Sequence, residues 1–187
     1  MRTLITILCS SLILAAPAAA QSGKGRESTE VRLQRLLDKE EITNVLLAYG
    51  RSLDARDFAT YSSLFATDGE WVGGFGTVKG PAAIKALMEK TLGTGGNKSG
   101  NYHLLSNFVI TVTGDTATAW SRWTFVQPGE RGAAIAQAGR YEDIFVRENG
   151  AWKFKRRTAA SDAGGRSRTA AATAGAPTEA PANAPAK

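Results

Sequence analysis

The chain has 187 residues, with 23 Lys and Arg against 17 Asp and Glu, which gives a net charge of +6. This moderately basic charge comes without the aromatic-interleaved motifs of nucleic-acid-binding proteins, so we expect no nucleic-acid partner. The single cysteine, Cys9, lies within the first twenty residues. The remainder of the chain can therefore form neither a disulfide nor a thiolate metal site.

The first twenty residues have the pattern of a secretory signal peptide. Arg2 precedes an apolar run from Leu4 to Ala16, and Ala18-Ala19-Ala20 supplies the small residues of a cleavage site. The apolar run is too short to span a membrane as a retained helix, which disfavours the alternative of an uncleaved anchor. We predict a periplasmic or secreted protein that leaves the membrane after cleavage, with residues 21–28 as a polar linker.

Three helices are predicted before the main sheet. The first begins near Ser28 or Thr29 and extends to about Leu53, because apolar residues recur at three- and four-residue spacing. Asp57 is the predicted N-cap of a short second helix over Phe58–Phe65. The apolar stripe of the first helix consists of Val31, Leu33, Leu36, Leu37, Ile42, Val45, Leu46 and Tyr49.

A short strand and a third helix follow. Thr67-Asp68-Gly69 predicts a turn, and Glu70–Phe75 predicts a strand with a glycine bend. Pro81 suits the first position of a helix that extends to Leu92. The glycine-rich segment Gly93–Gly100 lacks the spacing of a phosphate-binding loop and precedes a strand. We interpret it as a flexible loop that would form a lip over a pocket.

The second half of the domain reads as an antiparallel meander of four strands, rich in β-branched and aromatic residues. Turns are predicted at Gly114-Asp115, Pro128-Gly129 and Asn149-Gly150, where the residue types tolerate turn geometry. The strands are Asn101–Thr113, Thr116–Gln127, Ala133–Arg147 and Ala151–Arg157.

The end of the predicted domain carries a basic cluster and a change of composition. Lys153, Lys155, Arg156 and Arg157 are interpreted as a solvated edge that discourages pairing between sheets. After Thr158 the chain is dominated by Ala, Thr, Gly and Pro, without apolar periodicity, so residues 159–187 are predicted to be a disordered tail. The folded unit is therefore one domain over residues 29–158.

The order of these segments and their amino-acid sequences resemble those of the SnoaL-like branch of the nuclear transport factor 2-like superfamily. The stretches that carry the resemblance are LLAYGRSLDARDFATYSSLFATDGEW, VKGPAAIKALM, NYHLLSNFVITVTGDTATAWSRW and RYEDIFVRENGAWKFKRRT. The resemblance implies an α+β cone, in which three N-terminal helices pack on a strongly curved, mainly antiparallel sheet and leave an apolar pocket. Because this superfamily includes dehydratases, isomerases, cyclases and non-catalytic binding modules, the fold leaves the function open.

The nearest catalytic pattern is similar to that of scytalone dehydratase. Asp54, near the end of the first helix, and His103, the only histidine, match its aspartate and one of its histidines. The second histidine of that pattern falls near Ser121, and its asparagine falls near Tyr141. The ketosteroid isomerase pattern, an aspartate base on the sheet with a Tyr/Asp pair that binds the oxyanion, is not evident. Asp143 is the only sheet carboxylate that would serve as that base.

Imidazole titrates near neutrality, so His103 suits general acid/base chemistry if a carboxylate orients it. The hypothesis is a cofactor-independent dehydratase (a lyase) or isomerase acting on a small hydrophobic, oxygenated molecule. The alternative is a non-catalytic ligand-binding or dimeric interaction module, in which His103 and Asp54 have structural roles only. The predicted pocket residues are Tyr49, Trp71, Tyr102, Ser121, Trp123 and Tyr141.

Two further expectations concern partners. No cluster of His, Asp and Glu has metal-ligand spacing, so we expect neither a metal nor a cofactor. Trp120 and Trp123 lie on opposite faces of one strand, which means that large apolar residues occupy both faces of the sheet. A homodimer through the sheet face opposite the pocket is therefore predicted.

Overall fold

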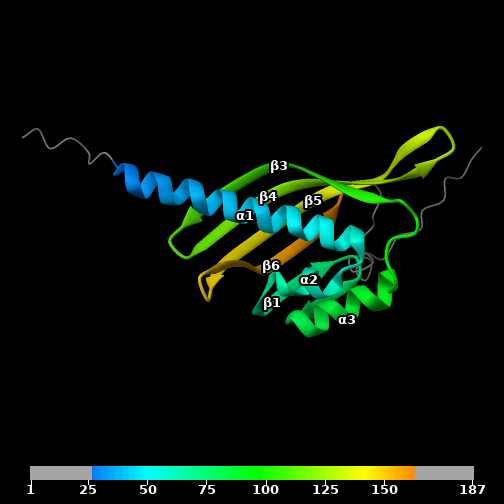
Figure 1. The fold of residues 1–187 in the computed structure, drawn as a ribbon, viewed down its shortest axis with the longest axis horizontal. Coiled ribbons are helices and arrows are strands. Elements are labelled where there is room, and N and C mark those ends of the chain that lie inside the picture. The colour runs from blue at the N-terminus through cyan, green and yellow to red at the C-terminus, as the bar shows by residue number, and fades with distance from the viewer. Residues whose placement is uncertain (1–26, 163–187) are drawn as a thin grey trace, which may run out of the picture.

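The computed structural model describes residues 27–162, in which three helices lie against a six-stranded sheet (Figure 1). The predicted signal peptide, most of the predicted linker and the chain after Asp162 lie outside the described residues. None of the helices in the described part is long and apolar enough to cross a membrane.

The first two helices begin where a side-chain cap satisfies one of the first free N–H groups. Helix α1 (Thr29–Ala55) starts at Ser28, whose Oγ accepts a hydrogen bond from the N–H of Val31 at 3.2 Å. It ends at Arg56, which adopts a left-handed conformation with φ of 61°. Helix α2 (Phe58–Ser63) is two residues shorter than predicted, because Phe65 already belongs to a strand.

Helix α3 spans Pro81–Leu92, as the proline and the apolar spacing predict. The six strands run in the spatial order β2-β1-β6-β5-β4-β3, and every neighbouring pair is antiparallel except β1 and β6. This confirms the α+β cone with its mainly antiparallel sheet. The strands are β1 (Phe65–Gly73), β2 (Gly76–Lys79), β3 (Tyr102–Thr113), β4 (Thr116–Gly129), β5 (Gly132–Glu148) and β6 (Ala151–Ser161).

Several turn and strand boundaries differ from the sequence-based expectation. The predicted turn at residues 67–69 lies inside β1, where the pairing with β6 shifts register and Glu148 accepts the N–H of Thr67. The predicted turn at Pro128-Gly129 is part of β4, since the chain reverses at Glu130 and Arg131. Strand β6 continues to Ser161, past the boundary drawn at Thr158, because its last residues pair with β5.

The apolar stripe of α1 is buried only along its C-terminal half. Ile42, Leu46 and Tyr49 are buried and pack on the inner face of the sheet. The N-terminal turns extend past the sheet (Figure 1), and Leu33 and Leu36 there are 54% and 65% exposed. The first half of the predicted stripe therefore has no cover within the described residues.

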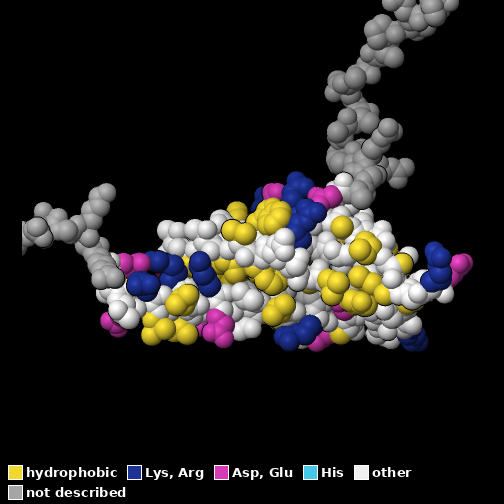
Figure 2. Space-filling model, turned by 90° about the horizontal axis from the view of Figure 1, so that it is seen from above, with side chains coloured by type: hydrophobic (Ala, Val, Ile, Leu, Met, Phe, Trp, Pro, Cys, Tyr) yellow, Lys and Arg dark blue, Asp and Glu magenta, His cyan; other side chains and the backbone are white. Residues whose placement is uncertain are grey.

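Apolar side chains also occupy the outer surface. Figure 2 shows them gathered in patches between Lys and Arg side chains on one face of the molecule. Leu104 and Val109 of β3 and Ile144 of β5 are between 46% and 62% exposed. The outer face of the sheet is thus apolar in part, as the predicted homodimer requires.

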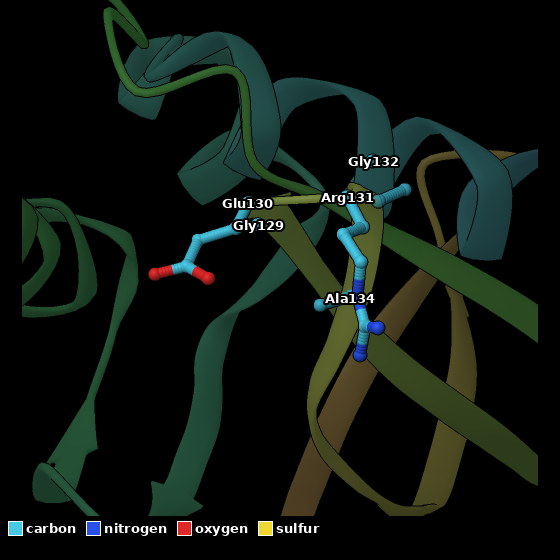
Figure 3. Close-up of a pocket in the computed structure, with 6 residues that line it drawn as sticks. Gly129, Glu130, Arg131, Gly132 and Ala134 are labelled. Carbon is cyan, nitrogen blue, oxygen red and sulfur yellow. The ribbon is translucent and has the colours of Figure 1, made fainter.

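The hairpin formed by β4 and β5 projects beyond the rest of the sheet (Figure 1). A cavity of about 370 Å³ lies at its tip, between Gly129 and Ala134. Figure 3 shows the side chains of Glu130 and Arg131 leaving this tip in different directions. None of the predicted site residues lines this hollow.

Candidate functional site

Asp54 and His103 are in direct contact, although 49 residues separate them in the sequence. The Asp54 carboxylate accepts the backbone N–H of His103 through Oδ2 at 2.8 Å, and its Oδ1 lies 2.6 Å from the ring Nδ1. Because both oxygens are used, the carboxylate fixes the strand and the ring together. The side chains of His103 and Asp54 are 16% and 20% exposed, so the pair is half-buried and still open to solvent.

A glycine on α1 makes this contact possible. A Cβ on Gly50 would stand 2.7 Å from Cδ1 of Leu105, so the absence of a side chain lets α1 approach β3. Asp54 lies four residues after Gly50, on the same helix face, and His103 lies two residues before Leu105, on the same strand face. The close approach at Gly50 therefore brings the carboxylate onto the imidazole. From the sequence alone, Gly50 indicates only a position of low helix propensity.

The contact with the Asp54 carboxylate selects the tautomer of the neutral His103 ring. An ionised carboxylate only accepts hydrogen bonds, so Nδ1 of His103 must carry the proton that points to Asp54. In the neutral ring, Nε2 then has the free lone pair, and within residues 27–162 no hydrogen bond occupies it. An imidazole oriented by a carboxylate, with its second nitrogen free, is suited to take and return a proton.

A row of aromatic rings leads from His103 into the interior. The His103 ring centroid lies 6.3 Å from that of Trp123, which lies 6.0 Å from Tyr141, and Tyr141 lies 5.6 Å from Tyr49. The indole Nε1–H of Trp71 donates to the Tyr49 hydroxyl at 3.1 Å. Four of the predicted pocket residues are thus brought together on the inner face of the sheet.

Trp123 lies flat over a glycine of the next strand. A Cβ on Gly139 would stand 2.5 Å from the indole Cζ2 and 2.1 Å from the carbonyl oxygen of Ala160, so any larger residue would displace the ring. The indole Nε1–H donates to the carbonyl of Arg140 at 3.2 Å. Trp123 is therefore held in a fixed orientation between His103 and Tyr141.

Tyr102 is the predicted pocket residue that the structure places elsewhere. Neighbouring residues of a strand point to opposite faces, so Tyr102 faces outward when His103 faces inward. It is 40% exposed. The expectation that both side chains line one pocket is therefore wrong.

The interior holds an ion pair that the sequence analysis missed. Arg157, which was assigned to a solvated basic edge, is fully buried and forms two hydrogen bonds with Asp143, at 2.8 and 2.7 Å. Its guanidinium lies 3.9 Å from the Tyr49 ring and 4.0 Å from the Tyr141 ring. The assignment was wrong because Arg157 occupies an inward position after a register shift between β5 and β6. Asp143 is committed to this pair and is not a free base.

Burial and charge explain the ionisation of this interior. Burial alone lowers the pKa of Arg157, but the Asp143 carboxylate outweighs that effect and raises the pKa above its ordinary value. Burial raises the pKa of Tyr61 and Tyr141 well above the usual range, with a further contribution from Tyr49. The arginine is therefore charged and these two phenols are neutral at physiological pH.

Two buried polar atoms on the inner face lack partners within residues 27–162. They are the Oγ of Ser121, whose side chain is completely buried, and the Nη1 of Arg157. Both atoms can donate a hydrogen bond to an oxygen. Within the same residues, no group of three or more His, Cys, Asp and Glu side chains is placed to hold a metal.

The fold defines a class of protein, the nuclear transport factor 2-like cones. A protein of that description with a cystatin-like fold, from Novosphingobium aromaticivorans, is 30% identical and superimposes with a TM-score of 0.65, covering 78% of this chain and 97% of its own. A cystatin-like protein from Nostoc punctiforme is also 30% identical, with a TM-score of 0.60, over 68% of this chain and 92% of its own.

A third structure is described as a candidate scytalone dehydratase, also from N. aromaticivorans. It is 27% identical with a TM-score of 0.59, over 70% of this chain and 88% of its own. The profile of the SnoaL-like domain matches residues 34–158. The chain therefore belongs to the SnoaL-like domain family. No curated protein matches it.

Proposed function

We propose that the protein is a cofactor-independent dehydratase or isomerase that acts on a small, largely apolar, oxygenated molecule. The observation that carries this proposal is the Asp54–His103 contact, with Nδ1 held at 2.6 Å and Nε2 free. His103 is the general acid/base, and Asp54 is the residue that orients it. The likeness to a candidate scytalone dehydratase supports this class of reaction.

His103 takes a proton next to a carbonyl of the substrate, or donates one to a departing hydroxyl, through Nε2. Asp54 stabilises the imidazolium that forms, since its carboxylate already accepts the Nδ1 proton. The Phe125 ring, 4.9 Å from the His103 ring, and the Trp123 ring, 6.3 Å from it, give the imidazole apolar neighbours.

The test is turnover of a panel of hydroxy-ketones, steroids and polyketide-like aromatics. Loss of an acid/base catalyst costs about 10²–10⁴ in rate, so His103→Gln should nearly abolish turnover and Asp54→Asn should weaken it. Ser106→Ala, an exposed position on the same strand, is the matched control. If His103→Gln retains the wild-type rate on a substrate that the protein turns over, the proposed mechanism is wrong.

A non-catalytic binding cone is the second candidate. It is favoured by Ser121, which stands near the position where the scytalone dehydratase pattern has its second histidine. A binding module needs the aromatic row but no proton transfer. It would be the correct description if a panel member binds equally well to wild type and His103→Ala while neither protein changes it chemically.

A further inference from the structure

A second cavity, of about 270 Å³, lies where the end of α1 meets the glycine-rich loop between α3 and β3. We call it the loop hollow. Its wall contains two positive side chains, Arg56 and Lys98, the hydroxyls of Thr94 and Ser99, and the apolar side chain of Leu92. No carboxylate lines it. Its charge is therefore complementary to an anion.

Both cations are available for a ligand. Arg56 donates from Nη1 to the carbonyl of Leu53 at 2.9 Å, and within residues 27–162 neither Arg56 nor Lys98 forms an ion pair. The two nearest carboxylates in the chain are already engaged. Asp54 bonds to His103, and Asp57 accepts the N–H of Thr60 at 3.0 Å as the cap of α2. The positive charge of the loop hollow is thus not cancelled by these acids.

The loop holds its own shape. The amide nitrogen of Asn97 donates to the carbonyl of Asn101 at 2.6 Å, and its oxygen accepts both the N–H and the hydroxyl of Ser99, at 3.2 and 2.9 Å. The Oδ1 of Asn101 is buried and has no partner among the described residues. A polar wall that is ordered before binding loses less entropy when a ligand arrives.

Two short stretches of chain connect the loop hollow to the Asp54–His103 pair. Arg56 follows Asp54 by two residues, and Ser99 precedes His103 by four residues, a span of at most about 14 Å for an extended chain. Resting on the proposed function, we propose that the loop hollow binds an anionic group of the substrate, a carboxylate or a phosphate, while the reacting carbon faces His103. The substrate class is then a small apolar acid or phosphate ester.

Anion binding is measured by titrating the full chain at low salt with inorganic phosphate and, separately, with benzoate, followed by NMR. Binding should weaken as NaCl is added. It should be about tenfold weaker in Lys98→Gln and in Arg56→Gln, which each remove a charged donor. Lys90→Gln removes the same charge from the exposed surface of α3, outside the loop hollow, and should bind like wild type. Tighter benzoate binding identifies a carboxylate site, and tighter phosphate binding identifies a phosphate site.

The outcome is independent of turnover. His103→Gln should bind both anions like wild type, so anion binding without turnover supports the loop hollow even where the proposed function fails. Arg56→Gln also loses the hydrogen bond to the carbonyl of Leu53 and could fail to fold for that reason. Lys98 is an exposed loop residue, so Lys98→Gln keeps the test valid in that case. The inference is overturned if wild type binds neither anion, or if Lys98→Gln binds as tightly as Lys90→Gln.

Discussion

Removing the charge of Asp143 should destabilise the domain more than any surface substitution. Its partner Arg157 is fully buried, forms two hydrogen bonds with the carboxylate and has one nitrogen, Nη1, without a partner among the described residues. Asp143→Asn keeps the side-chain volume but leaves the guanidinium charge uncompensated. Breaking a buried pair in this way costs about 3–5 kcal/mol.

Urea unfolding followed by circular dichroism measures this cost. With a denaturant slope of about 2 kcal/mol per M, the midpoint should fall by about 1.5–2.5 M. The matched control is Glu70→Gln, which breaks the exposed pair with Arg156 in the adjacent position of β6. An exposed ion pair contributes about 1 kcal/mol or less, so that midpoint should fall by no more than about 0.5 M.

A double variant separates charge from packing. Replacing both partners with apolar residues, as in Asp143→Leu with Arg157→Met, removes the unpaired charge and should recover most of the lost stability. The reasoning is refuted if Asp143→Asn shifts the midpoint no more than Glu70→Gln does.

Burial raises the pKa of Asp38, but hydrogen bonds from Gln34, Arg147 and Trp152 outweigh it and lower the pKa. A lowered folded-state pKa contributes stability above the unfolded value of about 3.9, and this contribution is lost as the pH falls through the folded value. The difference in urea midpoint between wild type and Asp38→Asn should therefore shrink below about pH 4, and a constant difference would contradict this. We expect a homodimer through the outer sheet face, which light scattering at a monomer mass across micromolar concentrations would disprove. We expect the protein to be exported and to begin after residue 20, and N-terminal sequencing that reads Met1 would exclude cleavage.

The local elements follow from local chemistry. Period-2 alternation predicts the strands, three- and four-residue spacing predicts α1, and Pro81 marks the start of α3. These signals depend on neighbouring residues, so they were readable without the fold. The boundaries that failed, at residues 67–69 and at Pro128, depend on pairing with distant strands, which extends a strand through residues that favour turns.

Sequence signals predicted only part of the candidate site. The family resemblance selected Asp54 and His103, and period-2 alternation placed Ser121 and Trp123 on one face. The same alternation, applied to β3, would have excluded Tyr102 from the face that carries His103. The role of Gly50 depended on Leu105, a residue 55 positions away, and no local pattern indicates such a contact.

Arg157 shows most clearly what the sequence determined and what it did not. Its position in a cluster of four basic residues predicts a strand edge in solvent. Strand β6 instead lies between β1 and β5, and Arg156 is exposed on a face of the sheet. A register shift between β5 and β6 turns the next residue, Arg157, into the core, where Asp143 and two tyrosine rings surround it. The sequence by itself determined the residue types, the elements and their order. The tertiary structure decided which charges are buried, because burial depends on strand register and on partners that lie far away in the chain.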